Sequence, residues 1–369
     1  MPRSARSNCS DTLIRVSIRA DIRSLFELRP SPVRWPIALQ AAVAIGIPTV
    51  GFALAGRSDL GLLASTGGFL ALYLTNRSRQ ERAAKLPFIA AGLVASAALG
   101  VLASGSLLGS LLAVFAIAAV SATLCLGLAV GPPGALFFVL IGGVATHLAG
   151  PTSIGGAGID GALIVGLLVL GCVISYAVVL SPLLLPSVRR RDAAVHETRV
   201  PMRFVFDSIS RVILTRLVVA SALAVAIAVP LGLPRAYWVV LTVVVILQNG
   251  HTVRLSALRA VHRVLGTFVG LGLFALIALL APEGLWLALV LMALQFVVEM
   301  VIIRNYGLAL VFITPLALLI STQGGHVDEI IADRVLDTLI GTAIALVVLL
   351  GAVALRRIRP ERDAPDAAA

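Results

Sequence analysis

Twelve apolar runs, separated by short polar or charged connectors, make up most of the chain. In the first half they cover residues 35–56, 60–75, 86–104, 107–129, 132–148 and 161–180. In the second half they cover residues 212–231, 236–248, 264–281, 285–303, 306–321 and 335–355. A helix of about 20 apolar residues crosses a bilayer. The pattern therefore predicts an all-α, polytopic helical membrane protein with about 12 transmembrane helices.

The composition agrees with a chain that is solvated by lipid. Of its 369 residues, 59% are hydrophobic and 13% are charged, and the mean hydropathy is +1.03. A soluble domain of this size could not bury so much apolar surface, so the lipid bilayer is the expected partner. The net charge of +11 would suit nucleic acid. The arginines stand in short connectors, however, which favours anionic lipid headgroups and predicts no nucleic-acid partner.

The basic residues are distributed unevenly between alternate connectors. If the N-terminus lies in the cytoplasm, all but three of the 29 Lys and Arg residues fall on the inner side, the exceptions being Arg57, Arg235 and Arg334. The outer connectors carry Asp59, Asp160, Glu283, Asp328, Glu329 and Asp333. The positive-inside rule then predicts a multi-pass protein of the cell (inner or plasma) membrane with both termini in the cytoplasm.

The two halves of the chain repeat one another. At nearly constant spacings, Thr66 matches Thr242, Gly92 matches Gly266 and Gly166 matches Gly341. Such constancy along a half-chain indicates tandem duplication. Six spans per unit is an even number, so both copies insert in the same direction. We therefore predict two tandem parallel six-helix repeats, over residues 35–180 and 212–355, with a polar crevice where they meet.

Three flanking segments complete the organisation. Residues 1–34 are a basic cytoplasmic or interfacial N-terminus, in which residues 12–29 have the pattern of an amphipathic helix. Residues 181–211 are a cytoplasmic linker, and residues 356–369 are a cytoplasmic tail. Short or broken spans often mark a transport pathway. The second and fifth runs of each half are short or contain Gly or Pro, so we expect them to line it.

Three stretches of the second half carry a specific combination of motifs. They are RAYWVVLTVVVILQ (235–248), RAVHRVLGTFVG (259–270) and EMVIIRNYGLALVFITPLALL (299–319). Together they resemble the fusaric acid resistance protein-like family of integral membrane transporters, which is related to the aromatic acid exporters. The resemblance implies efflux of aromatic and other weak organic acids, with a small organic anion as substrate and a pseudo-dimeric pore.

The first half departs from the family pattern. Leu60-Gly61 stands in place of the Tyr-Trp pair, and Gly-Pro-Pro-Gly (131–134) stands in place of Arg-Asn-Tyr-Gly. Only the linker 181–211 occupies the place of the large cytosolic domain of longer family members. These departures bear on any function of that domain and on the symmetry of the pore lining.

Charged residues at the inner ends of the later spans are the first candidates for a substrate path. Glu299 lies about one turn inside the tenth span, where an acid is costly. It is either a protonation site or the ion-pair partner of Arg304 or Arg263. Arg259, Arg263 and Arg304 lie at the inner mouth, where guanidinium groups suit carboxylates. The alternative role for these arginines is positive-inside anchoring.

The family motifs and small clusters supply the remaining candidates. The motif residues Asn305, Tyr306, Thr267 and Pro315 are assigned to the path, and Gly266 and Gly270 to close helix packing. Tyr237 and Trp238 are either interface-belt aromatics or a stacking platform for an aromatic substrate. His147 and His262 have no metal-ligand spacing, which favours packing or surface roles. We expect Asp337 to form a local pair with Arg334.

No motif for an enzyme or a nucleotide site is convincing. Residues 156–161 match GxGxxG, but no strand precedes them, and Cys9, Cys125 and Cys172 lack CxxC spacing. We expect no enzyme activity, no metal and no cofactor. The function expected is secondary, proton-coupled efflux of aromatic or weak organic acids. The alternatives are a passive organic-anion channel and a non-transporting membrane scaffold, and the oligomeric state is left open.

Overall fold

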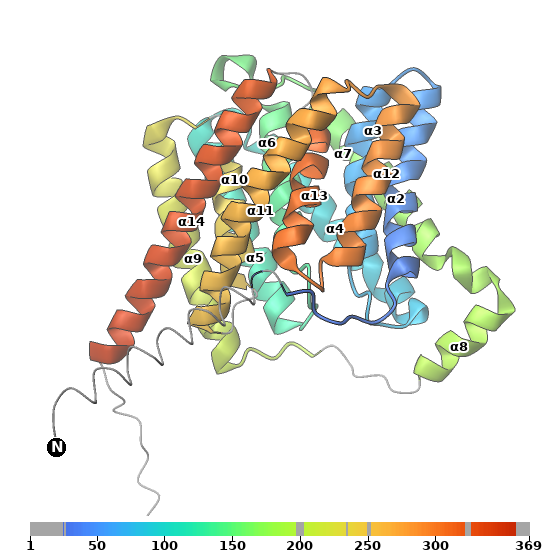
Figure 1. The fold of residues 1–369 in the computed structure, drawn as a ribbon, viewed down its shortest axis with the longest axis horizontal. Coiled ribbons are helices and arrows are strands. Elements are labelled where there is room, and N and C mark those ends of the chain that lie inside the picture. The colour runs from blue at the N-terminus through green and yellow to red at the C-terminus, as the bar shows by residue number, and fades with distance from the viewer. Residues whose placement is uncertain are drawn as a thin grey trace, which may run out of the picture.

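The structure is a computed structural model that describes residue 25 and residues 27–196, 203–233, 235–248, 252–321 and 326–358. These residues form a bundle of thirteen α-helices and three short 3-10 helices, without a strand (Figure 1). The α-helices of the first half and the linker are α2 (Trp35–Leu54), α3 (Ser58–Ser65), α4 (Arg79–Leu102), α5 (Leu107–Gly127), α6 (Leu136–Ala149), α7 (Gly161–Leu180) and α8 (Pro186–His196). Those of the second half are α9 (Ser208–Leu231), α10 (Tyr237–Gln248), α11 (Val253–Leu279), α12 (Gly284–Val301), α13 (Tyr306–Ser321) and α14 (Val327–Ile358). The 3-10 helices are η1 (Thr66–Leu72), η2 (Thr152–Ile154) and η3 (Ser181–Leu184).

Eight of the described helices are long and apolar enough to cross a membrane, namely α2, α4, α5, α7, α9, α11, α12 and α14. Four shorter apolar segments accompany them: Ser58–Leu72, Leu136–Ala149, Tyr237–Gln248 and Tyr306–Ser321. In chain order these four hold the second and fifth places of each half. The all-helical fold predicted from the hydropathy pattern is therefore confirmed, with eight helices of the described residues long enough to span a membrane where about 12 were expected.

Several helices, α11 and α14 among them, begin earlier than the apolar runs that predicted them. Thr252 caps α11, because its hydroxyl accepts a hydrogen bond of 3.2 Å from Leu255 N. In α14 the first turn carries Asp328 and Glu329, which favour the positive end of the helix dipole. Residues 253–263, expected in a basic connector, are therefore helical, and Arg334, expected in an outer connector, lies about two turns inside α14.

α13 passes through Pro315 without the interruption that the sequence suggested. A membrane helix tolerates proline where neighbouring helices and hydroxyl groups satisfy the freed carbonyls. Pro315 leaves the Val311 carbonyl without its helical donor, and the neighbouring Leu310 carbonyl accepts a hydrogen bond of 2.8 Å from the Thr314 hydroxyl.

The linker between the halves also contains helical structure. η3 and α8 occupy its first part, and the Asp192 carboxylate of α8 accepts hydrogen bonds from Arg79 N and Gln80 N at 2.7 and 3.0 Å. This contact ties α8 to the start of α4. Most of residues 12–29, where an amphipathic helix is expected, and most of the expected tail lie outside the described residues, while residues 27–34 are irregular.

Helix contacts in one half have counterparts in the other. α4 packs on α6 and α7, and α11 packs on α13 and α14; α5 contacts α6, and α12 contacts α13. Between the halves, α12 packs on α2 and α9 packs on α5, while α10 contacts α6 and α13 contacts α3. In each half the first helix therefore meets the fourth helix of the other, and the second meets the fifth.

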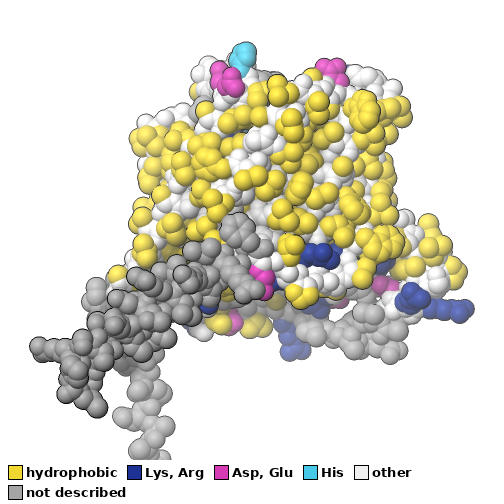
Figure 2. Space-filling model, in the orientation of Figure 1, with side chains coloured by type: hydrophobic (Ala, Val, Ile, Leu, Met, Phe, Trp, Pro, Cys, Tyr) yellow, Lys and Arg dark blue, Asp and Glu magenta, His cyan; other side chains and the backbone are white. Residues whose placement is uncertain are grey.

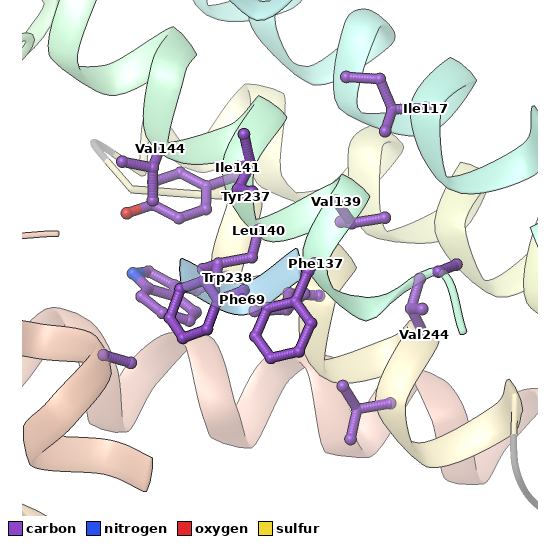
Figure 3. Packing of buried hydrophobic residues seen from close by; sticks show 14 of the residues in the cluster. Phe69, Ile117, Phe137, Val139, Leu140, Ile141, Val144, Tyr237, Trp238 and Val244 are labelled. Atoms are coloured by element: carbon purple, nitrogen blue, oxygen red, sulfur yellow. The ribbon is translucent and has the colours of Figure 1, made fainter. Parts of the chain in front are cut away.

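The bundle has a packed apolar core, an apolar outer surface and charged residues at its two ends, as a membrane protein has. Tyr237 and Trp238 of α10 pack among Phe69, Phe137 and Leu140 of the first half (Figure 3). Apolar side chains cover the middle of the face of the bundle that Figure 2 shows. We call the end at which α4, α8, α9 and α11 begin the basic face, with Arg79, Arg189, Arg211 and Arg254. The opposite end, the acidic face, carries Asp59, Asp160, Glu283 and Asp328.

Candidate functional site

Two arginines lie inside the second half, away from both faces. Arg334 of α14 is 2% exposed, and its guanidinium carbon lies 3.7 Å from the centre of the Trp238 ring. Arg263 of α11 is 3% exposed, and its Nη2 reaches Thr242 Oγ1 at 3.5 Å, a long contact. We call Arg263 and Arg334 the arginine pair. Sequence reasoning selected Arg263 but assigned Arg334 to the outer side.

The buried polar atoms around the arginine pair are mostly unpaired donors. Those without a hydrogen-bond partner among the described residues are Arg263 Nε, Arg334 Nε and Nη1, Trp238 Nε1, Thr267 Oγ1, Thr338 Oγ1 and Thr342 Oγ1. A buried donor left unpaired costs about 1–3 kcal/mol, and more if it is charged. Guanidinium and indole N–H groups donate and do not accept. The arrangement therefore suits an anion or water molecules.

One acid lies close to the arginine pair. Asp337 of α14 is 2% exposed, and its Oδ2 lacks a hydrogen-bond partner among the described residues. It lies within electrostatic range of Arg334 and Tyr237. Closer to the acidic face, Arg235 pairs with Asp333 at 2.6 Å. With Asp337 ionised, the arginine pair still carries an excess positive charge.

The other predicted residues of the inner mouth meet at the basic face. The Arg259 guanidinium lies 5.0 Å from the centre of the Tyr306 ring, and Asn305 Nδ2 donates to the carbonyls of Leu25 and Glu27 at 2.8 and 3.3 Å.

The irregular segment before α2 is held at this face. His262 Nε2 lies 3.0 Å from the Leu25 carbonyl, Arg29 N donates to the Arg304 carbonyl at 3.1 Å, and Arg304 Nε reaches Ser31 Oγ at 3.4 Å. The segment therefore crosses the ends of α11 and α13, and Arg304 contacts this segment at the surface.

Glu299 has a different partner from the two that sequence reasoning offered. It pairs with Arg34, whose Nη2 lies 2.8 Å from Glu299 Oε2, and not with Arg304 or Arg263. The reason is the packing of α12 against α2, which turns Glu299 toward the residue that precedes α2.

The aromatic pair at the start of α10 is not an interface belt. Tyr237 and Trp238 are each 2% exposed, because α10 is surrounded by other helices on all sides. The Tyr237 ring packs against the backbone of α6, where a Cβ added at Gly143 would lie 2.6 Å from Tyr237 Cδ2. One face of the Trp238 ring is covered by Arg334.

Close approach of α11 and α13 occurs at small residues. A Cβ added at Gly266 would lie 2.4 Å from the Gly307 carbonyl oxygen, and one at Gly270 would lie 2.7 Å from Thr314 Cβ. Thr267 and Pro315 are buried at the same helices. These residues therefore hold α11, which carries Arg263, against α13.

The meeting of the halves is apolar where the sequence suggested a polar crevice. A cavity of about 30 Å³ lies between α13 and the first half, which is room for about two water molecules. Its lining includes Phe69, Leu140, Val144, Leu168 and Ser321. The polar groups gather inside the second half instead, because the first half supplies apolar side chains here.

Sequence reasoning undervalued Arg334 and Asp337. The available signal was the acidic pair Asp328 and Glu329, which is typical of a helix start. That signal would have extended the last span toward its N-terminus and placed both charges inside it.

Comparisons with known proteins agree with a membrane protein of this kind. Residues 221–348 match the model of the family described as fusaric acid resistance protein-like. The chain is 25% identical over 485 residues to the uncharacterized membrane protein YvaC of Bacillus subtilis (strain 168), with 94% of this chain and 76% of the relative covered. It is 36% identical over 136 residues to the uncharacterized protein YhfK of Escherichia coli (strain K12), which covers 35% of this chain and 18% of the relative. No solved structure matches.

The matched region contains the arginine pair, Asp337 and the aromatic pair of α10. The resemblance seen in the three sequence motifs is confirmed over residues 221–348, which match the model of the fusaric acid resistance protein-like family and contain all three motifs.

Proposed function

We propose that the chain is a secondary transporter that exports weak organic anions across the cell membrane, and that the arginine pair binds the carboxylate of the substrate. The observation that carries this proposal is the burial of Arg263 and Arg334 with unpaired N–H groups beside Trp238. Ionisable side chains inside a membrane are costly and are usually functional. A carboxylate would satisfy several of these donors at once.

The charge distribution supports an anionic substrate. The basic face, which we take as cytoplasmic by the positive-inside rule, attracts anions from the cell interior. Within the bundle the arginine pair exceeds the charge of Asp337, so an anion would be stabilised there by Coulomb attraction in a low-dielectric setting. Trp238, which covers Arg334, would place an aromatic ring beside an aromatic or apolar part of the substrate.

The packing supports two like-oriented repeats of six membrane segments each, over residues 35–180 and 212–355. The helix contacts of the two halves correspond, and the four short segments occupy equivalent places. At the sequence spacings of the repeat, Ile89 corresponds to Arg263 and Ile159 corresponds to Arg334. The transporter would therefore have one anion site, in the second repeat, while the first repeat supplies an apolar wall.

Narrow cavities favour a transporter over an open channel. The cavities that lie beside Tyr237 and beside Ser321 each have room for about two water molecules. Passage would then need the halves to move relative to one another, as in alternating access.

Flux through the purified protein tests the proposal. Proteoliposomes would be loaded with labelled benzoate and compared with protein-free liposomes, with and without a pH gradient. We expect protein-dependent benzoate exchange that Arg263→Ala and Arg334→Ala each reduce at least about tenfold, since a hydrogen bond to a charged group contributes about 1.5–3 kcal/mol. Arg189→Ala, an exposed arginine of α8, is the matched control. Normal flux in both buried-arginine variants would refute the assignment.

A further inference from the structure

A second small cavity lies toward the acidic face, on the side of Tyr237 that faces the first half. Its lining comes from α5, α6, the loop after α6 and the start of α10: Leu107, Ser110, Leu111, Thr146, His147, Gly150, Ile154, Gly156, Ala236 and Tyr237. The cavity has a volume of about 30 Å³, which is room for about two water molecules. It therefore joins an imidazole of the first half to a phenol of the second.

His147 is suited to exchange protons with water at the acidic face. Its side chain is half-buried, while its Nδ1 is buried and has no hydrogen-bond partner among the described residues. The centres of the His147 and Tyr237 rings lie 6.4 Å apart. Histidine is the side chain whose ordinary pKa lies nearest neutrality. An unpaired ring nitrogen beside a water-sized cavity is a natural point for a proton to enter.

The charged surroundings of His147 are simple. Arg235, just before α10, is the charged group within electrostatic range of it. The lining contributed by α5 and by the loop after α6 carries no charged side chain. Asp160, at the start of α7, is exposed and accepts a hydrogen bond from Leu163 N at 2.8 Å.

Tyr237 lies between this cavity and the arginine pair. Its hydroxyl is buried and forms no hydrogen bond of normal geometry with the described residues. It lies within electrostatic range of Arg334 and Asp337, and it also approaches Ser321. The carboxylate of Asp337 has an unpaired Oδ2. Three unpaired groups, each able to give or take a proton, thus follow one another from the acidic face inward.

We propose that His147, Tyr237 and Asp337 form a proton route from the acidic face to the anion site, with water in the cavity completing the link. Protonated His147 gives the proton on Nδ1 toward Tyr237 Oη. The Tyr237 hydroxyl passes its own proton to Asp337 Oδ2. At the end His147 and Tyr237 are neutral, and Asp337 has gained the proton and lost its charge.

Along this route, protonation of Asp337 removes the negative charge that lies beside the arginine pair. Ionised Asp337 competes with a substrate carboxylate for Arg334, whereas protonated Asp337 does not. An anion therefore binds more tightly when a proton has arrived from the acidic face, so the pH at that face regulates the affinity of the anion site. The inference rests on the proposed function and adds to it this regulation by pH and the residues that conduct the proton.

The experiment separates anion exchange from its dependence on pH. Benzoate exchange would be measured in proteoliposomes of the full chain, first at equal pH inside and outside, then as a function of external pH from about 4 to 8, a range that includes the ordinary pKa of histidine and extends well below it. The variants are His147→Gln and Tyr237→Phe, which keep the size of the side chain. His326→Gln, an exposed histidine near the start of α14, is the matched control.

We expect wild type and His326→Gln to respond to external pH, by up to about tenfold per pH unit if one proton limits the rate. His147→Gln and Tyr237→Phe are expected to retain exchange at equal pH but to lose that response.

A wild-type pH profile in both variants would overturn the proton route while leaving the anion site intact. A wild-type protein whose exchange does not depend on pH would do the same. Loss of exchange at every pH in both variants, together with a loss of thermal stability, would also overturn the route, because that combination marks a packing role. Absence of benzoate exchange in wild type would overturn the proposed function and the route together.

Discussion

Arg34 and Glu299 join the two halves of the chain at the basic face. Arg34 Nη2 lies 2.8 Å from Glu299 Oε2, and Arg34 Nε donates to the Glu299 carbonyl at 3.2 Å. The side chains are 12% and 8% exposed. Arg34 precedes α2, and Glu299 lies in α12, the fourth helix of the second half. The ion pair therefore holds α2 against α12 at the basic end of their interface. We propose that Glu299 acts in closing this interface.

Glu299→Gln is expected to lower the thermal stability of the detergent-solubilised protein. Breaking a buried ion pair leaves one charge uncompensated, at a cost of about 3 kcal/mol. The double variant R34M/E299L should recover much of the loss, since an apolar pair of similar volume avoids that charge. Asp59→Asn is the control, because its partner Arg57 is exposed and exposed pairs contribute little. Equal melting temperatures for wild type and Glu299→Gln would contradict this role.

Asp337→Asn is expected to tighten anion binding. The change removes the carboxylate that competes for Arg334 and keeps the shape of the side chain. We expect the Kd for benzoate to fall about tenfold, which corresponds to about 1.4 kcal/mol, and the measurement is isothermal calorimetry in detergent. Asp333→Asn, which disrupts the ion pair with Arg235 nearer the acidic face, should have a smaller effect. Weaker benzoate binding in Asp337→Asn would argue that Asp337 positions Arg334 and does not compete with substrate.

Gly266→Ala is expected to destabilise the packing of α11 on α13. The added Cβ would lie 2.4 Å from the Gly307 carbonyl oxygen, which is backbone and cannot rotate away. Overpacking of this kind costs about 1–3 kcal/mol. Thermal unfolding of the purified variant measures it.

Gly272→Ala is the matched change on the same helix. Nothing lies within 4 Å of a Cβ at Gly272, and alanine is favoured over glycine in a helix by about 1 kcal/mol. This variant should therefore be as stable as wild type or more stable. If Gly266→Ala and Gly272→Ala behaved alike, α11 and α13 would not meet at Gly266.

Asn305→Ala is expected to release the segment that precedes α2 from the basic face. The Asn305 amide donates to two carbonyls of that segment, and its Oδ1 also accepts from Leu308 N at 2.9 Å. Hydrogen exchange should become faster at Arg29, whose amide donates to the Arg304 carbonyl. Ser31→Ala removes a long contact to Arg304 and a local hydrogen bond to the Pro32 carbonyl, and it should leave that exchange nearly unchanged. Protection of Arg29 in Asn305→Ala would show that the segment is held by other contacts.

The membrane class and the order of its helices could be predicted from the sequence. Long apolar stretches and the clustering of arginine in connectors are local properties, and lipid selects for them directly. The motifs around Trp238, Gly266 and Asn305 were also visible, because they are short and contiguous. Helix starts were harder to predict. The apolar run that predicted α14 begins at residue 335, whereas the helix itself begins at Val327.

Tertiary packing alone decided which charges meet. Glu299 lies five residues from Arg304 in the chain but pairs with Arg34, because the orientation of α12 against α2 sets its direction. Tyr237 and Trp238 have the composition of a membrane-interface pair, but α10 is enclosed by other helices and buries them. Hydropathy is a local property that indicates whether a segment prefers lipid or water. It does not indicate which helices pack together, so the arginine pair and the nearby Asp337 could be identified only from the tertiary structure.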